Sequence, residues 1–224
     1  MSYHIKTAQI EWQNNKQPVS ARFDDPYYSI QDGLEESRYV FLTGNGLPDR
    51  FADGFHIAEL GFGTGLNLLA AWQSWNASGQ KGRLNYTSFE AYPMTITDMR
   101  IALSNWPELK PLADLMLTQM ELGTFKIETP TLTARIILGD ARTTLPKWQY
   151  KADAWFLDGF SPVKNPELWG KDILQSVANH TVSGGTCATY TAAGHVRQSL
   201  ASAGFTVTRV TGFGRKRHMT IGIL

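Results

Sequence analysis

The chain has 224 residues, 42% of them hydrophobic and 18% charged, and its formal net charge is +1. This composition is typical of a globular chain long enough to bury the core of one α/β domain. No apolar run approaches the roughly 18 residues of a membrane-spanning helix, and the first residues do not resemble a signal peptide. We therefore expect a cytoplasmic protein without membrane contact. The single cysteine, Cys187, cannot form an internal disulfide and should be an inert thiol in a buried strand.

Residues 1–54 lack a regular alternation of strands and helices. We expect two short strands there, 5–12 and 18–23, around the turn signal Asn14-Asn15. Helical spacing follows over residues 32–42. Three apolar side chains of that stretch should face inward: Leu34, Tyr39 and Leu42. Since no linker rich in Pro or Gly follows, we predict an N-terminal extension, 1–54, packed on a main domain of residues 55–224.

From residue 55 onward, strand candidates alternate with helical runs. The expected strands are 55–60, 84–90, 133–138, 152–158, 184–190 and 205–210. The expected helices are 66–77, 95–104, 167–180 and 194–203. This alternation predicts a parallel sheet covered by helices on both faces. The final run, 218–224, follows its predecessor after too short a loop for a parallel crossover, so the last strand should be antiparallel.

The most informative motif joins the first of these strands to the first helix: Glu59-Leu-Gly61-Phe-Gly63-Thr-Gly65-Leu-Asn67. This order places backbone N–H groups and a helix N-terminus beside a polar ligand. A dinucleotide fingerprint would need its third glycine at Leu66, one residue later than the glycine found here. The motif resembles that of class I S-adenosylmethionine methyltransferases. It predicts five cofactor-binding residues: Glu59, Gly61, Gly63, Gly65 and Asn67. The acid either orients the turn or bonds the amino group of the ligand.

Acids close three successive strand candidates after this turn. Glu90 can accept hydrogen bonds from the hydroxyls of a ribose. Asp140 can accept one from the exocyclic amine of an adenine, whose ring nitrogen would meet the N–H of Ala141. The third acid is Asp158. A single Asp at a strand end is commonly a cap or turn residue, whereas three such acids in succession favour a nucleoside-type ligand.

Asp158 begins the segment Asp158-Gly-Phe160-Ser-Pro162, which resembles the Asn/Asp-Pro-Pro-aromatic segment of amino-methylating enzymes. A primary alkylamine is mostly protonated at neutral pH, and its lone pair must be free to attack a sulfonium methyl group. Asp158 can orient the ammonium and accept its proton, so it is a candidate catalytic residue. Phe160 can pack on a flat base that carries the amine. The alternative is a structural turn that uses Gly159 and Pro162.

The charges are unevenly distributed, because no Asp or Glu follows Asp172. That region carries a set of cationic residues: Arg197, Arg209, Arg215, Lys216 and Arg217. A basic end on a nearly neutral chain indicates a polyanionic partner on one face. Chance segregation of solvated charges is the alternative. Three adjacent cations are costly to bury, so residues 215–217 should form a solvent-facing loop that is free to contact phosphate.

The chain is similar to the methyltransferase unit of the MnmC-type tRNA 5-methylaminomethyl-2-thiouridine biosynthesis enzymes. The matching segments are residues 23–29, 32–42, 59–67, 155–162, 164–166 with Trp169, and 212–217. The resemblance implies a doubly wound, Rossmann-like class I methyltransferase sheet with an antiparallel last strand. It also implies that S-adenosyl-L-methionine supplies a methyl group to the aminomethyl substituent on carbon 5 of the wobble uridine in tRNA.

The resemblance further implies roles for several residues. Arg215, Lys216, Arg217 and Lys164 would contact phosphates of the tRNA anticodon stem-loop. Tyr28 would close over the ligand or the base, with core packing as the alternative. Many members continue into a C-terminal FAD-dependent oxidoreductase. This sequence has no second glycine fingerprint, so we expect no flavin in it, and either a stand-alone enzyme or part of a fused one. No His/Cys cluster has metal-ligand spacing, and we expect no metal.

Two other functions remain open at this stage. The same fold serves methyltransferases that act on amines of small molecules or proteins, because a fold does not determine a substrate. A module that binds tRNA or the cofactor without catalysis is the second alternative. The basic end of the chain distinguishes the tRNA enzyme from the first of these, and cofactor binding distinguishes it from the second.

Overall fold

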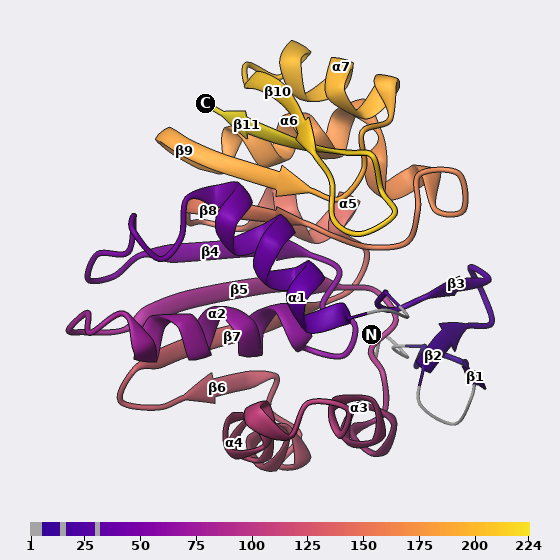
Figure 1. Cartoon of the computed structure of the whole chain (residues 1–224), viewed down its shortest axis with the longest axis vertical. Coiled ribbons are helices and arrows are strands. Elements are labelled where there is room, and N and C mark those ends of the chain that lie inside the picture. The colour runs from indigo at the N-terminus through magenta and orange to yellow at the C-terminus, as the bar shows by residue number, and fades with distance from the viewer. Residues whose placement is uncertain (1–5, 14–16, 30–31) are drawn as a thin grey trace.

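A computed structural model describes residues 6–13, 17–29 and 32–224, and the structural statements that follow concern these residues. The main sheet is built from β4 (His56–Leu60), β5 (Leu84–Glu90), β6 (Lys126–Glu128), β7 (Leu132–Leu138), β8 (Ala152–Leu157), β9 (Thr181–Thr189), β10 (Thr206–Thr211) and β11 (His218–Ile223). Their order across the sheet is β10-β11-β9-β8-β4-β5-β7-β6. Figure 1 shows β10 and β11 at one end of this sheet and β6 at the other.

The centre of the sheet is parallel and both of its ends are antiparallel. β4 pairs in parallel with β5 and β8, and these pair in parallel with β7 and β9. β11 is antiparallel to both β9 and β10, so the prediction for the last strand is confirmed. The short strand β6 runs antiparallel to β7 and was not predicted. Only one of its three side chains is buried, which gives it too weak a pattern to detect.

Helices lie on both faces of the sheet. They are α1 (Gly33–Ser37), α2 (Leu66–Ala77), α3 (Ile96–Leu103), α4 (Lys110–Glu121), α5 (Ala141–Thr144), α6 (Lys171–Asn179) and α7 (Gly194–Ser202). Short 3-10 turns are η2 (Thr43–Asn45), η3 (Pro107–Leu109), η4 (Leu145–Lys147) and η5 (Pro166–Trp169), and η1 (Arg38–Leu42) is a π-helix. The predicted helix 66–77 matches α2, and the predicted helix 167–180 is divided at Gly170 into η5 and α6.

The sequence prediction missed α4, although its buried side chains have helical spacing: Ala113, Met116, Leu117 and Met120. The prediction for Tyr39 was wrong, because this side chain is 37% exposed and its hydroxyl donates to the carbonyl of Thr211. The cause is the π-helical winding of η1, which changes the angular spacing that a 3.6-residue helix would give. Leu34 and Leu42 are buried as expected.

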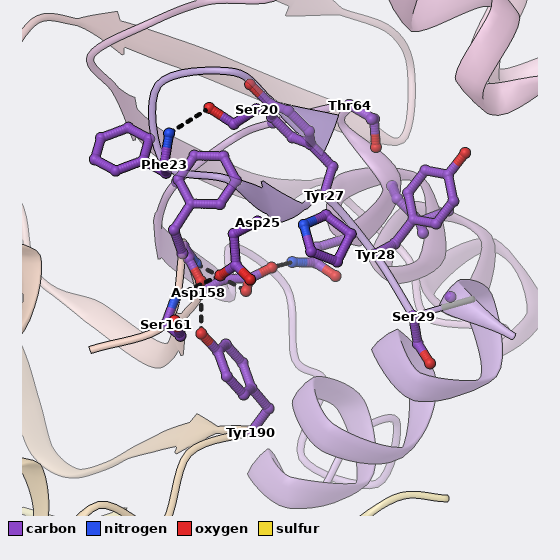
Figure 2. Close-up of a pocket in the computed structure, with 18 of the residues that line it drawn as sticks. Ser20, Phe23, Asp25, Tyr27, Tyr28, Ser29, Thr64, Asp158, Ser161 and Tyr190 are labelled. Carbon is purple, nitrogen blue, oxygen red and sulfur yellow. Dashed lines mark hydrogen bonds between the residues drawn. The ribbon is translucent and has the colours of Figure 1, made fainter. Parts of the chain in front are cut away.

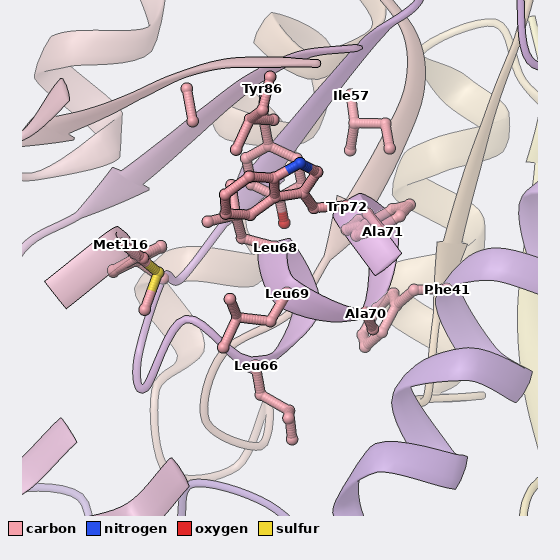
Figure 3. Packing of buried hydrophobic residues seen from close by; sticks show 14 of the residues in the cluster. Phe41, Ile57, Leu66, Leu68, Leu69, Ala70, Ala71, Trp72, Tyr86 and Met116 are labelled. Atoms are coloured by element: carbon pink, nitrogen blue, oxygen red, sulfur yellow. The ribbon is translucent and has the colours of Figure 1, made fainter. Parts of the chain in front are cut away.

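Two hydrophobic clusters lie on the two faces of the sheet. Figure 3 shows one of them, in which Leu68, Leu69 and Trp72 of α2 pack near Tyr86 of β5 and Met116 of α4. The other lies under α5, α6 and α7 and contains Trp155 and Cys187. The buried position of Cys187 raises the pKa of its thiol to about 12, as expected for an inert core cysteine. Within the described residues, no helix is both long and apolar enough to span a membrane.

The N-terminal residues form a separate, small antiparallel sheet. It consists of β1 (Ile10–Gln13), β2 (Gln17–Ser20) and β3 (Asp25–Pro26). Two strands were predicted here, and both are shorter than expected; the turn at Asn14-Asn15 lies outside the described residues. Figure 1 shows this sheet beside the edge where the parallel strands of the main sheet end. In an open α/β sheet that edge is where ligands bind.

Candidate active site

A cavity of about 930 Å³ lies at the carboxyl ends of the parallel strands. Its walls come from the glycine turn after β4, the ends of β5 and β8, the N-terminal residues and the loop between β10 and β11. Figure 2 shows Asp158, Tyr190 and Asp25 directed toward one another in this cavity, with the side chains of Phe23 and Tyr27 beside them. Segments far apart in the sequence therefore meet at one site.

The glycine turn can approach its neighbours closely because its three glycines lack side chains. Gly61 has φ +83°, and a Cβ atom there would lie 3.2 Å from the Cα atom of Gly159 in the turn after β8. Gly65 has φ +81° and a Cβ atom would lie 3.0 Å from Met116 and Phe62. Gly61 and Gly63 line the cavity, whereas Gly65 is the N-cap of α2. The first two glycines thus expose backbone to a ligand, and the third allows the start of α2 to pack closely against Met116 of α4.

Glu90 ties the glycine turn to the end of β5. Its carboxylate accepts hydrogen bonds from the N–H of Gly63 at 3.0 Å and the N–H of Tyr92 at 2.7 Å. Burial raises the pKa of Glu90, while these backbone donors act in the opposite direction. The side chain lines the cavity where the sequence placed a ribose-binding acid.

Asp140 acts as a helix cap in this structure. One carboxylate oxygen accepts from the backbone N–H of Arg142 at 2.9 Å, and the other pairs with the Arg142 guanidinium at 2.5 Å. These hydrogen bonds hold the pKa of Asp140 below its usual value. Asp140 and Ala141 line a second cavity of about 480 Å³, which shares Gly61 and Glu90 with the main one. Both carboxylate oxygens of Asp140 are therefore hydrogen-bonded within its own turn. Asp140 nevertheless lies next to Glu90, the acid predicted to bind the ribose.

A buried hydrogen-bond network lies behind the glycine turn, with Asn67 at its centre. The Asn67 amide donates to Glu59 at 2.9 Å and to Asp158 at 2.7 Å, and its oxygen accepts from Ser37 at 2.5 Å. Glu59 also accepts from the Ser88 hydroxyl at 2.7 Å. Because Glu59 is fully buried and does not line the cavity, this geometry favours its orienting role over contact with a ligand. Burial raises its pKa well above the usual value.

Asp158 is the carboxylate that the network presents to the cavity. It follows β8, and its second oxygen accepts from the N–H of Gly159 at 2.8 Å. Burial raises the pKa of Asp158 to about 6, against the opposing effect of its hydrogen bonds to Gly159 and Asn67. A group with this pKa is ionised at neutral pH and can take up a proton from a bound amine.

Aromatic rings form one wall of the cavity. Phe160 stacks on Phe23 with 4.7 Å between ring centroids, and Tyr27 meets Phe160 edge-on at 5.0 Å. The indole N–H of Trp169 donates to the carbonyl of Phe160, so Trp169 anchors this loop as a buried residue. Since Phe23 covers one face of Phe160, a base could stack only on the rest of the ring.

Tyr28 lies at the boundary between the cavity and the core. Its ring lines the cavity and also packs edge-on against Trp106 at 4.9 Å. Its hydroxyl accepts a hydrogen bond from the amide of Asn105 at 2.9 Å. Burial raises the pKa of Tyr28 to about 12, so it is a neutral phenol at the cavity wall.

Two of the four predicted RNA-binding cations are engaged by acids of the N-terminal region. The Lys164 ammonium lies 2.9 Å from a carboxylate oxygen of Asp24, and that of Lys216 lies 2.6 Å from Glu36. The expectation that residues 215–217 are all free to contact phosphate is therefore corrected for Lys216. Arg215, Lys216 and Arg217 are all exposed, as expected for a solvent-facing loop.

Among the side chains of this cavity that sequence reasoning missed are Asp25, Tyr27, Glu36 and Tyr190. The Asp25 carboxylate accepts from the N–H of Ser161 at 2.8 Å, which joins the N-terminal sheet to the loop after β8. None of these residues carries a local signal of function, because each reaches the site through tertiary contacts alone. Among the described residues, no group of three or more His, Cys, Asp or Glu side chains could hold a metal ion.

Comparison with known families identifies the reaction class of this site. A family model described as S-adenosyl-L-methionine-dependent methyltransferase matches residues 97–224, which is more than half of the chain. The chain belongs to this family. Its methyl donor is therefore S-adenosyl-L-methionine, and it is a methyltransferase. The cavity fits this donor, since the backbone of Gly61 and Gly63 is accessible and the carboxylates of Glu90 and Asp158 favour a cationic sulfonium.

Individual relatives agree with this family. The chain is 44% identical, over 96% of its length, to the tRNA 5-methylaminomethyl-2-thiouridine biosynthesis bifunctional protein MnmC of Chromobacterium violaceum. It spans only 34% of that relative. The solved structure of MnmC2 from Aquifex aeolicus is 27% identical, with a TM-score of 0.77 over 98% of this chain and 71% of that one. This similarity confirms the class I methyltransferase fold.

A more distant structure shares the fold alone. Spermidine synthase from Thermotoga maritima is 9% identical to the chain, with a TM-score of 0.53 over 97% of this chain and 72% of that one. At this identity the similarity concerns only the arrangement of strands and helices. The specific reaction must be argued from the side chains of the site.

Proposed function

We propose that this methyltransferase converts 5-aminomethyl-2-thiouridine at the wobble position of tRNA into 5-methylaminomethyl-2-thiouridine. The observation that carries the proposal is the Asp158 carboxylate, which faces the cavity with a pKa raised to about 6. Such a group complements an alkylammonium and can accept its proton. The name of the Chromobacterium violaceum relative supports 5-methylaminomethyl-2-thiouridine in tRNA as the product.

The proposed reaction assigns a task to each part of the site. S-adenosyl-L-methionine, when bound, would supply the methyl group, with its C–S bond broken as the C–N bond to the amine forms. Asp158 takes the proton that leaves the nitrogen, while Asn67 and Gly159 hold the carboxylate in place. Gly61, Gly63, Glu90 and Tyr28 bind the donor, with Asp140 and Ala141 toward its adenine. Phe160 contacts the target base on the ring face that Phe23 leaves open.

The proposal includes the organisation of the chain and its partners. The extension, 1–54, and the methyltransferase domain, 55–224, work as one unit, because the two regions share two ion pairs, of which Lys216–Glu36 lies at the cavity. The tRNA anticodon stem-loop binds near the loop between β10 and β11, in the cytoplasm. The Chromobacterium violaceum relative is named as bifunctional and is about three times as long as the matched region. If the chain is part of a fused protein, a C-terminal FAD-dependent oxidoreductase would carry out the other reaction of the bifunctional enzyme.

Nucleoside mass spectrometry tests this function directly. Purified protein, S-adenosyl-L-methionine and tRNA carrying the aminomethyl group should give the methylated nucleoside, and cells without the gene should accumulate the unmethylated one. Methylation of a small amine or a peptide, with none on tRNA, would favour another N-methyltransferase. If calorimetry detects no binding of S-adenosyl-L-methionine, the non-catalytic module is the correct alternative.

Reversing two exposed cations should separate tRNA recognition from chemistry. The double substitution Arg215→Glu and Arg217→Glu should lower kcat/KM for tRNA by at least about tenfold and reduce its salt dependence, because phosphate contacts are lost. Methylation of the free nucleoside should be unchanged. Lys81→Glu is a matched control, since Lys81 is exposed in the loop before β5, at the opposite edge of the sheet. Equal losses in the two proteins would contradict a specific role of the hairpin loop.

The rate of methyl transfer should fall as the pH decreases through about 6. The pKa of Asp158 is raised to about 6, so the group is protonated below that pH and cannot accept a proton. A decrease of about tenfold per pH unit is expected on the acidic side. Single-turnover rates with saturating donor would measure it. Calorimetric titration of the donor over the same range controls for Glu90, and a rate that is constant down to pH 5 would contradict the role of Asp158.

A further inference from the structure

The cavity of this enzyme already contains an alkylammonium group, and that group belongs to the chain itself. The Lys216 side chain reaches from the loop between β10 and β11 to Glu36 of α1, with 2.6 Å between Nζ and the carboxylate oxygen. The same nitrogen lies 4.2 Å from the centroid of the Tyr190 ring. All three residues line the cavity. The side chain of Glu36 is only 12% exposed, so this carboxylate is largely shielded from water.

The contacts of Lys216 are those that bind alkylammonium ligands. A carboxylate supplies a charge-assisted hydrogen bond, and an aromatic face supplies cation–π attraction. The Tyr190 ring is fixed for this purpose, because its hydroxyl donates to the carbonyl of Gly159 at 2.8 Å and its ring meets Trp169 edge-on. Glu36 and the face of Tyr190 therefore form a recess that fits a cation.

This recess adjoins the carboxylate that would accept the proton. Tyr190 is hydrogen-bonded to Gly159, which directly follows Asp158. The charge of Glu36 raises the pKa of Asp158 and the charge of Lys216 lowers it, so both are within electrostatic reach of it. Figure 2 shows the Tyr190 hydroxyl end pointing toward Asp158. A cation held at Glu36 would thus have the proposed proton acceptor as its neighbour.

We propose that Glu36 and the face of Tyr190 form the subsite for the ammonium group of the acceptor, and that Lys216 fills this subsite when no acceptor is bound. The inference rests on the proposed function and adds the residues that hold the amine. Lysine carries a primary alkylammonium, which is the same chemical group as an aminomethyl substituent. When the acceptor displaces it, Lys216 becomes available to a tRNA phosphate beside Arg215 and Arg217. Arrival of tRNA and opening of the subsite are thereby coupled.

A binding experiment without methyl transfer tests this subsite. The probe is 5-aminomethyluridine, a free nucleoside without phosphate, titrated by calorimetry into the protein saturated with S-adenosylhomocysteine. Lys216→Met should tighten its binding about tenfold, because a competing charged group is removed. Glu36→Gln should weaken it by a similar factor, and in the double variant the gain from Lys216→Met should be lost. The neutral probe 5-hydroxymethyluridine should show none of these changes.

Matched variants control for effects on folding. Glu35→Gln alters the neighbouring, exposed acid of α1, and Lys81→Met removes a distant exposed cation. Neither should change the affinity for the probe, and thermal melts should be similar for all variants. The proposal would be overturned if Lys216→Met bound 5-aminomethyluridine no more tightly than the unmodified protein, or did not bind it at millimolar concentrations. A purely structural ion pair would give equal effects on the charged and the neutral probes.

The result is independent of the test of function. If the charged probe binds through Glu36 while tRNA is not methylated, the proposed function fails and the ammonium subsite stands. If tRNA is methylated while Lys216→Met and Glu36→Gln leave binding of the charged probe unchanged, the subsite fails and the proposed function stands.

Discussion

Asp158→Ala should lower the single-turnover rate of methyl transfer to tRNA by about 10²–10⁴-fold, the range expected for loss of a general base. Binding of S-adenosyl-L-methionine should be largely retained: the charge of Asp158 is lost, but the glycine turn and Glu90 keep their own hydrogen bonds. The reason for the large effect is that Asp158 is the carboxylate that the buried network presents to the cavity. Rapid-quench assays with saturating donor measure the single-turnover rate, and calorimetry measures the affinity for the donor.

Two further variants make the Asp158 experiment decisive. Asp158→Asn keeps the shape of the side chain but cannot accept a proton, so it should be nearly as inactive as the alanine variant. Asp172→Ala removes an acid from the first turn of α6, away from the cavity residues, and should leave the rate unchanged. A normal rate in Asp158→Ala would show that the proton leaves by another route.

Asn67→Ala should destabilise the fold by about 2–5 kcal/mol, because buried polar groups lose their hydrogen-bond partner. The substitution removes the donor to both Glu59 and Asp158 and the acceptor of the Ser37 hydroxyl. Glu59 is fully buried, and of its donors Asn67 and Ser88 only Ser88 would remain. Each polar group left unsatisfied costs about 1–3 kcal/mol. Urea unfolding followed by circular dichroism measures the free energy of unfolding.

The control for this measurement is Asn179→Ala, at the exposed end of α6, which should change stability by less than about 0.5 kcal/mol. Glu59→Gln in the Asn67→Ala background should recover part of the loss, because a neutral amide is less costly to leave unpaired than a carboxylate. A loss below about 1 kcal/mol in Asn67→Ala would show that water replaces the amide. The network would then not be the element that orients Asp158.

The sequence alone determined the parts of this protein that depend on neighbouring residues. Alternating strands and helices predicted the sheet, and the short loop before β11 required an antiparallel last strand. The spacing of Gly61, Gly63 and Gly65 distinguished a methyltransferase turn from a dinucleotide fingerprint. These features follow from backbone geometry and hydrophobic periodicity, which act over a few residues and are therefore readable in one chain.

Only the tertiary structure decided how the charged groups are paired. Lys164 meets Asp24 across 140 positions of sequence and Lys216 meets Glu36 across 180, so no local pattern could reveal either pair. The role of Asn67 has the same origin, since it joins an acid in β4 to one that follows β8. Because such contacts form only when distant segments are packed together, the sequence identified the methyl donor, while the fold indicated where an acceptor amine would be held.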